Sequence, residues 1–80
     1  MNDLTNQQQF DNAMFNAGDA YLQLRSAMNS VGTAISCDDP FALMSALAKC
    51  NAHIRECMQC AINAQQHKIE EHKQEMQRFG

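Results

Sequence analysis

The sequence contains no tryptophan and a single proline, and aromatic residues make up only 6% of its 80 positions. Its three glycines, Gly18, Gly32 and Gly80, lie far apart, so they form no glycine-rich loop of the kind that binds phosphate. Alanine and methionine supply much of the 45% apolar content, a composition that favours helix-on-helix packing over a β-sheet core. The scarcity of aromatic residues therefore predicts an all-α protein.

An excess of positive charge is also absent, since 6 lysine and arginine residues stand against 9 aspartate and glutamate residues, and the formal net charge is −3. Without a basic patch to contact phosphate backbones, we expect no nucleic-acid partner. No apolar run approaches the length that crosses a bilayer, and residues 1–9 lack the basic and apolar pattern of a signal peptide. We therefore expect no membrane span, and synthesis in the cytoplasm without a cleavable signal.

The segment from Ser36 to Pro40 predicts a turn between two long helices. Asp38 and Asp39 are favourable N-cap residues, and Pro40 suits the first position of a helix, where its missing N–H would have no intrahelical partner. We expect a flexible N-terminal tail over residues 1–8 and one domain over residues 9–80. This domain is predicted to be a two-helix antiparallel, coiled-coil-like hairpin, with helices at about 9–34 and 40–78, a turn at about 35–39, and the second helix longer.

Apolar residues recur at spacings of three and four along both predicted helices, which indicates that the two helices pack against each other. In the first helix these residues are Phe10, Ala13, Met14, Ala17, Ala20, Tyr21, Leu24, Ala27, Met28, Val31, Ala34 and Ile35. In the second they are Leu43, Ala46, Leu47, Cys50, Ile54, Cys57, Ala61 and Ala64. The pattern predicts that Leu24, Val31, Leu47 and Ile54 are among the most buried side chains.

Two further groups of apolar residues point away from this predicted contact. One consists of Phe15 and Leu22, and the other is a stripe on the overhanging half of the second helix formed by Met58, Ile62, Ile69, Met76 and Phe79. Isolated exposed apolar residues are normal on protein surfaces, which is the simpler interpretation. However, a chain of 80 residues has little interior of its own, so we interpret these residues as contacts with another chain, either a second copy or another helical protein.

The spacing of Cys50, His53, Cys57 and Cys60 places them on one helical face, and thiolate and imidazole are ligands for zinc or copper(I). One ion cannot bind all four, because Cys50 and Cys60 are about 15 Å apart along the helix axis. The first helix has no cysteine or histidine to complete a site, so a metal centre requires a dimer. We favour packing as the role of these cysteines and expect no metal.

The sequence shows no nucleophile and base pair that indicates catalysis. His67 and His72 lie among charged residues that we expect to face solvent. We therefore expect a non-enzymatic protein without a cofactor or a small-molecule substrate.

Three short motifs stand out along residues 15–80, namely Phe15-Asn16-Ala17-Gly18 with Leu22-Gln23, Asp39-Pro40-Phe41-Ala42-Leu43, and Gln77-Arg78-Phe79. In these motifs and their spacing, the chain resembles the needle subunits of type III secretion systems. This resemblance implies a helical hairpin that self-assembles into a secreted or cell-surface filament. A small cytoplasmic adaptor or secretion chaperone that binds a partner helix is one alternative, and a dimeric Cys/His metal-binding helical bundle is the second.

Overall fold

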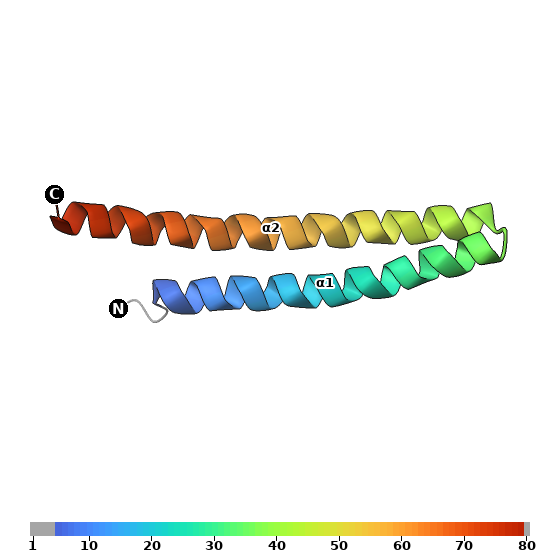
Figure 1. Ribbon diagram of the computed structural model, residues 1–80, viewed down its shortest axis with the longest axis horizontal. Coiled ribbons are helices and arrows are strands. Elements are labelled where there is room, and N and C mark those ends of the chain that lie inside the picture. Colours follow the sequence, from blue (N-terminus) through green and yellow to red (C-terminus); the bar gives the residue numbers. More distant parts are fainter. Residues whose placement is uncertain (1–4, 80) are drawn as a thin grey trace.

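The computed structural model describes residues 5–79, which form a hairpin of two α-helices (Figure 1). Helix α1 spans Asn6–Ser36 and helix α2 spans Pro40–Phe79, with 31 and 40 residues. No strand occurs within residues 5–79. The predictions of an all-α hairpin, a turn before Pro40 and a longer second helix are therefore confirmed.

Helix α1 begins three residues earlier than the sequence predicted. The hydroxyl of Thr5 accepts a hydrogen bond from the amide of Gln8 at 3.1 Å, and the Gln8 side chain accepts one from the amide of Thr5 at 2.9 Å. This reciprocal pair is a capping box, which satisfies two amides at a helix start. Residues 6–8 are thus helical and are not part of a flexible tail.

The turn is closed by backbone bonds at the end of α1 and by a side-chain cap at the start of α2. The amides of Asp38 and Asp39 donate to the carbonyls of Ile35 and Ala34 at 3.1 and 3.0 Å, and Asp38 has a left-handed φ of 53°. Such a left-handed residue is the usual way to end a helix. One Asp39 oxygen then accepts from the amides of Phe41 and Ala42 at 3.1 and 3.0 Å, so Asp39 is the N-cap that the sequence predicted.

The contact between the helices is built from small residues. Buried residues recur every seven positions in α1, and among the described side chains none of the buried residues is larger than cysteine. They are Ala13, Ala20, Ala27 and Ala34 of α1 and Ala46, Cys50 and Ala64 of α2. Half-buried residues lie on the same stripes, namely Asn6, Phe10, Ala17, Leu24 and Val31 of α1 and Leu43, His53, Cys57, Cys60, His67 and Glu71 of α2. We call these two sets together the seam.

The prediction that Leu47 and Ile54 are among the most buried residues is wrong, because they are 44% and 41% exposed. Leu24 and Val31 do lie in the seam but are only half-buried. Only two positions in each heptad face the other helix in a pair of this kind. The apolar stripe in the sequence is wider than that, so the residue that follows each buried alanine lies at the side of the hairpin.

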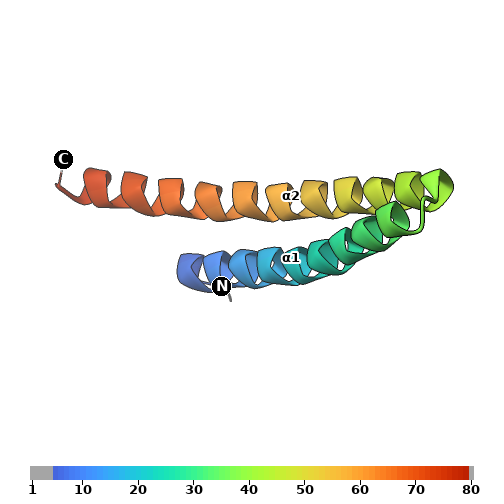
Figure 2. The ribbon, with the colours of Figure 1, turned by 45° about the vertical axis from the view of Figure 1, so that its right-hand side comes forward.

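A polar contact fixes how far the two helices are shifted along each other. The side-chain amide of Asn6 donates to the carbonyl of His67 at 2.8 Å, and Nδ1 of His67 lies 3.0 Å from the Asn6 amide oxygen. A polar residue in a helix seam specifies register in this way. Because α1 begins opposite His67, the last 12 residues of α2 extend about 18 Å farther, which is visible in Figures 1 and 2.

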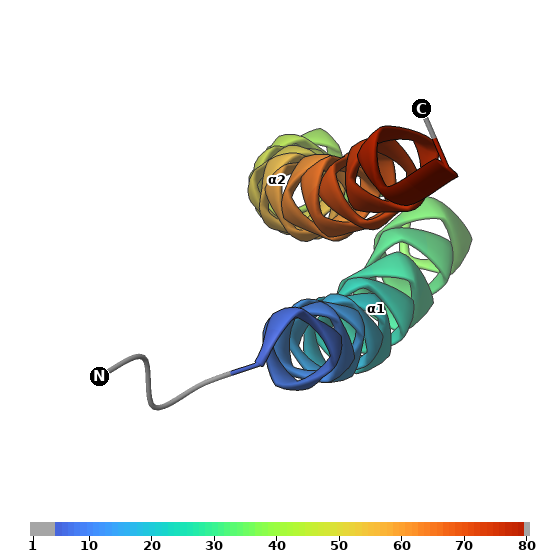
Figure 3. The same cartoon turned by 90° about the vertical axis from the view of Figure 1, so that its left-hand side faces the viewer.

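The hairpin is long and narrow, with principal extents of 61, 23 and 14 Å. Seen along its length, the two helices are inclined to each other and cross (Figure 3). Such a shape has two broad sides, each formed by residues that flank the seam on both helices.

Candidate interaction surfaces

One side of the hairpin is apolar along most of its length. In an antiparallel helix pair, the residues that follow the buried alanines of one helix lie beside their counterparts on the other. In α1 each of these residues is large and 49–59% exposed, and they recur every seven positions. We define the apolar face as Met14, Tyr21, Met28 and Ile35 of α1 with Leu47, Ile54 and Ala61 of α2.

Two hollows on this side combine residues from both helices, which supports the assignment. The first is near the turn and is lined by Ala34, Ile35, Asp38, Asp39, Pro40 and Leu43. The second is a groove of about 560 Å³ at the open end, lined by Phe10, Met14, Ala61, Ala64, Gln65, Lys68 and Ile69. We call the second hollow the open-end groove.

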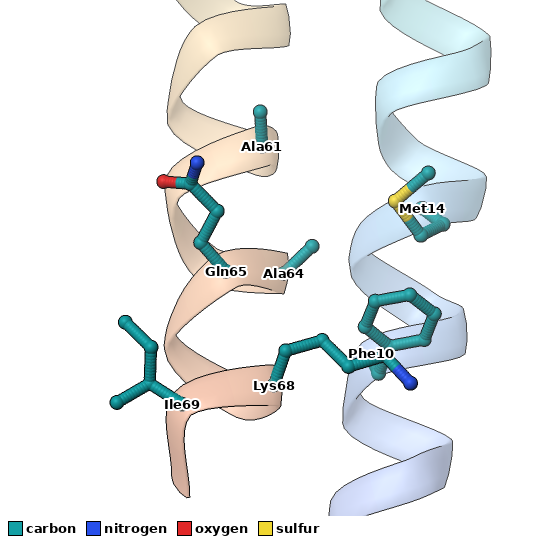
Figure 4. Close-up of a pocket in the computed structure, with 7 residues that line it drawn as sticks. All are labelled: Phe10, Met14, Ala61, Ala64, Gln65, Lys68 and Ile69. Carbon is teal, nitrogen blue, oxygen red and sulfur yellow. The ribbon is translucent and has the colours of Figure 1, made fainter. Parts of the chain in front are cut away.

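The open-end groove has an apolar floor and one cationic residue. Phe10 and Met14 from α1 lie opposite Ala61 and Ala64 of α2, and the Lys68 side chain reaches across toward Phe10 (Figure 4). The Lys68 ammonium is 4.5 Å from the centre of the Phe10 ring, a favourable cation–π distance. A carboxylate oxygen of Glu71 is 4.0 Å from the same ammonium, at the outer limit of an ion pair, so Lys68 remains able to pair with another carboxylate.

The opposite side of the hairpin is polar. The residues that directly precede Ala17, Leu24 and Val31 of α1, and most of those on the matching flank of α2, carry amides, hydroxyls or charges. We define the polar face as Asn16, Gln23, Ser30, Lys49, Glu56 and Asn63. Half of the residues that line a hollow near the turn on this side carry a hydroxyl or an amide, among them Ser26, Ser30, Thr33 and Ser45. The hairpin is therefore amphipathic as a whole, and not only along each helix.

The interaction residues predicted from the sequence are exposed wherever their side chains are described. Phe15 is 77% exposed and Leu22 is also exposed, and together they flank a shallow notch above Gly18. On α2 the C-terminal stripe, defined as Met58, Ile62, Ile69 and Met76, is exposed as well. The side chain of Phe79, which belonged to the predicted stripe, lies outside the described residues.

Sequence reasoning missed the apolar face and one further exposed residue, Phe41. Met14, Tyr21, Met28 and Ile35 were assigned to the helix contact because they continue the spacing of three and four. One sequence signal distinguishes these four residues from those of the seam. Each of them directly follows one of the buried alanines, namely Ala13, Ala20, Ala27 and Ala34. Phe41, beside the turn, is 86% exposed, the highest value among the exposed large apolar side chains of the described chain.

The four candidate metal ligands lie in the seam, where they face α1. Cys50 is buried and Cys57 is half-buried, with its thiol donating to the carbonyl of Ala17 at 3.6 Å. His53 is 2.9 Å from a carboxylate oxygen of Glu56 on the same helix. Within residues 5–79, no three His, Cys, Asp or Glu side chains are grouped to hold an ion. The burial of Cys50 and the contact of Cys57 with the backbone of α1 fit a role in packing.

Comparison of the chain with models of known families, with curated proteins and with solved structures finds no match in any of the three. In the described part of the chain, neither helix combines the length and apolarity needed to span a membrane.

Proposed function

We propose that this chain is a non-enzymatic assembly protein whose hairpins associate through exposed apolar helix surfaces. The observation that carries the proposal is the apolar face, which occupies one side of the hairpin while the other side is polar. Leaving apolar surface in water costs about 25 cal/mol per Å². The seam itself buries little apolar surface, since its buried residues are only alanine and cysteine. Association would cover the face and supply the missing core.

The exposed area supports the same proposal. The chain exposes 6334 Å², whereas a compact monomer of 9.0 kDa exposes about 4,850 Å². The surplus of about 1,500 Å² is roughly twice the ~800 Å² that one partner contributes to a standard interface. The elongated shape thus leaves surface for contacts with neighbouring copies.

A filament is the form of assembly that we favour, in line with the resemblance to type III secretion needle subunits. The apolar face lies beside the seam, whereas the C-terminal stripe lies on the outer side of α2. A subunit that contacts its neighbours through two different surfaces can propagate without closing, as filament subunits do. Such a subunit would be made in the cytoplasm and exported to the cell surface.

A secretion adaptor or chaperone is the second candidate. Its supporting observation is that the two hollows of the apolar side lie between the same two helices, one at each end. An amphipathic partner helix could lie between α1 and α2 on the apolar side and reach from one hollow to the other, as in helix-in-groove recognition. The metal-binding dimer has no comparable support, because a second copy could reach the seam cysteines only if the hairpin opened.

Light scattering coupled to gel filtration tests the proposal. We expect the wild-type mass to exceed 9.0 kDa severalfold and to rise with concentration. The change Met28→Asp places a carboxylate on the apolar face, where its burial is costly, and should lower the mass. The matched control Ser30→Asp adds the same charge two residues away, on the polar face, and should leave the mass unchanged.

Two outcomes would contradict a self-assembling subunit. If the wild-type chain is monomeric at every concentration and also binds no helical partner, both the filament and the adaptor proposals are overturned. A discrete 1:1 complex with a helical protein, formed by an otherwise monomeric chain, would select the adaptor over the filament. Circular dichroism of both variants checks that the hairpin remains folded.

A further inference from the structure

The two ends of the hairpin carry complementary features. The open-end groove is at one end, and Phe41 protrudes at the other, beside the turn. We infer that the open-end groove binds Phe41 of a second copy, so that hairpins stack head to tail. This inference rests on the proposed function and specifies one of its contacts.

Size and side-chain chemistry match at this contact. The groove, at about 560 Å³, is large enough for a phenyl ring, and Phe10 and Met14 line it. An aromatic ring prefers to pack edge-to-face or offset against another ring, and it also contacts methionine sulfur favourably. Phe41 gains from this burial because it packs against almost nothing within its own hairpin.

The charges around the two features are opposite. Lys68 is the charged residue that lines the groove, and its ammonium is only weakly paired within the chain. Asp38 and Asp39 precede Phe41 in the turn, and the Asp38 carboxylate takes no part in the helix cap formed by Asp39. A copy that inserts Phe41 brings these carboxylates close to Lys68. The pairing favours this occupant over an uncharged apolar segment.

The position of Phe41 favours stacking over a closed side-by-side dimer. Phe41 is separated by three heptads from Ile62, so it lies on the outer side of α2 and not on the apolar face. Ile69, one heptad farther along, points away from α1 and forms the outer edge of the open-end groove (Figure 4). Two hairpins that cover each other's apolar faces would leave Phe41 in solvent. The contact therefore joins opposite ends of a molecule 61 Å long, and such an end-to-end contact generates an open chain.

The experiment uses Met28→Asp as the parent, because that change removes the apolar-face contact and leaves the two ends intact. The parent should still grow in mass with concentration in analytical ultracentrifugation. Adding Phe41→Asp or adding Ile69→Asp should each give a 9.0 kDa monomer. An equimolar mixture of these two variants should form a 1:1 complex, because one retains the groove and the other retains Phe41. The control Met44→Asp changes another exposed apolar residue about one turn away and should behave as the parent does.

Three results would overturn the inference. The first is that the mixture of the Phe41→Asp and Ile69→Asp variants stays monomeric. The second is that the mass of the Phe41→Asp variant still rises with concentration. The third is that the Met28→Asp parent is monomeric or forms nothing larger than a dimer. Each leaves the proposed function standing as long as the wild-type chain assembles. If the wild-type chain fails to assemble, the proposed function fails with the inference.

Discussion

At the scale of single residues, the small size of the buried alanines determines that the residues next to them in the sequence are exposed to solvent. Ala13, Ala20, Ala27 and Ala34 present only a methyl group to α2, so the contact is narrow and the next residue along the helix stays outside it. In packed helices generally, the distance between the two helix axes depends on the size of the side chains at the contact. Sequence periodicity predicted the helices correctly but could not select this seam, because Leu47 and Ile54 have more apolar character than the alanine and cysteine that displace them.

A seam of this kind should tolerate enlargement poorly. Ala27→Leu adds three carbons where α1 faces α2, and overpacking of a filled contact typically costs about 1–3 kcal/mol. The matched control Ala52→Leu makes the same change at an exposed position of α2 and should alter stability by no more than about 0.5 kcal/mol. Urea unfolding at one fixed protein concentration measures both. Equal stability of the two variants would show that Ala27 is not packed against α2.

At the scale of elements, the helix ends explain which boundaries could be predicted. Asp39 and Pro40 form a strong local signal, and α2 begins where they indicate. The start of α1 was missed because the capping box from Thr5 to Gln8 lies in a stretch rich in asparagine and glutamine, which has the composition of a flexible tail. The register was also beyond prediction, since the Asn6 and His67 contact joins residues 61 apart in the chain.

The cap at Asp39 should contribute measurably to stability. Asp39→Ala removes the acceptor for the amides of Phe41 and Ala42, and loss of an N-cap side chain costs about 1 kcal/mol, within a range of about 0.5–2. Asp38→Asn removes the same charge from the turn but keeps a residue that tolerates the left-handed conformation, so it should be nearly neutral. Thermal unfolding compares the two variants. A larger loss from Asp38→Asn would mean that turn charge, not capping, stabilises the hairpin.

At the scale of the whole molecule, the outer residues were easier to predict than the apolar face. Phe15, Leu22 and the C-terminal stripe break the helix periodicity, so their exposure follows from one helix at a time. The apolar face depends on how the two helices are turned toward each other, which places Met14 of α1 beside Ala61 of α2. The residues that flank the seam on both helices can be assigned to one side only once the seam is known. Neither helix alone carries that information in its sequence.

The C-terminal stripe should matter for assembly and little for folding. Ile69 and Met76 are exposed and lie near or beyond the start of α1, so Ile69→Asp with Met76→Asp should leave the helicity of the hairpin close to that of the wild type. A carboxylate buried without a partner is far more costly at an interface than in water, so the double variant should not form long assemblies. The control Asn63→Asp with Gln77→Asp adds two carboxylates to the polar flank of the same helix and should assemble normally. Electron microscopy and sedimentation distinguish the two, and long assemblies formed by the Ile69 and Met76 variant would show that the overhanging part of α2 faces solvent in the filament.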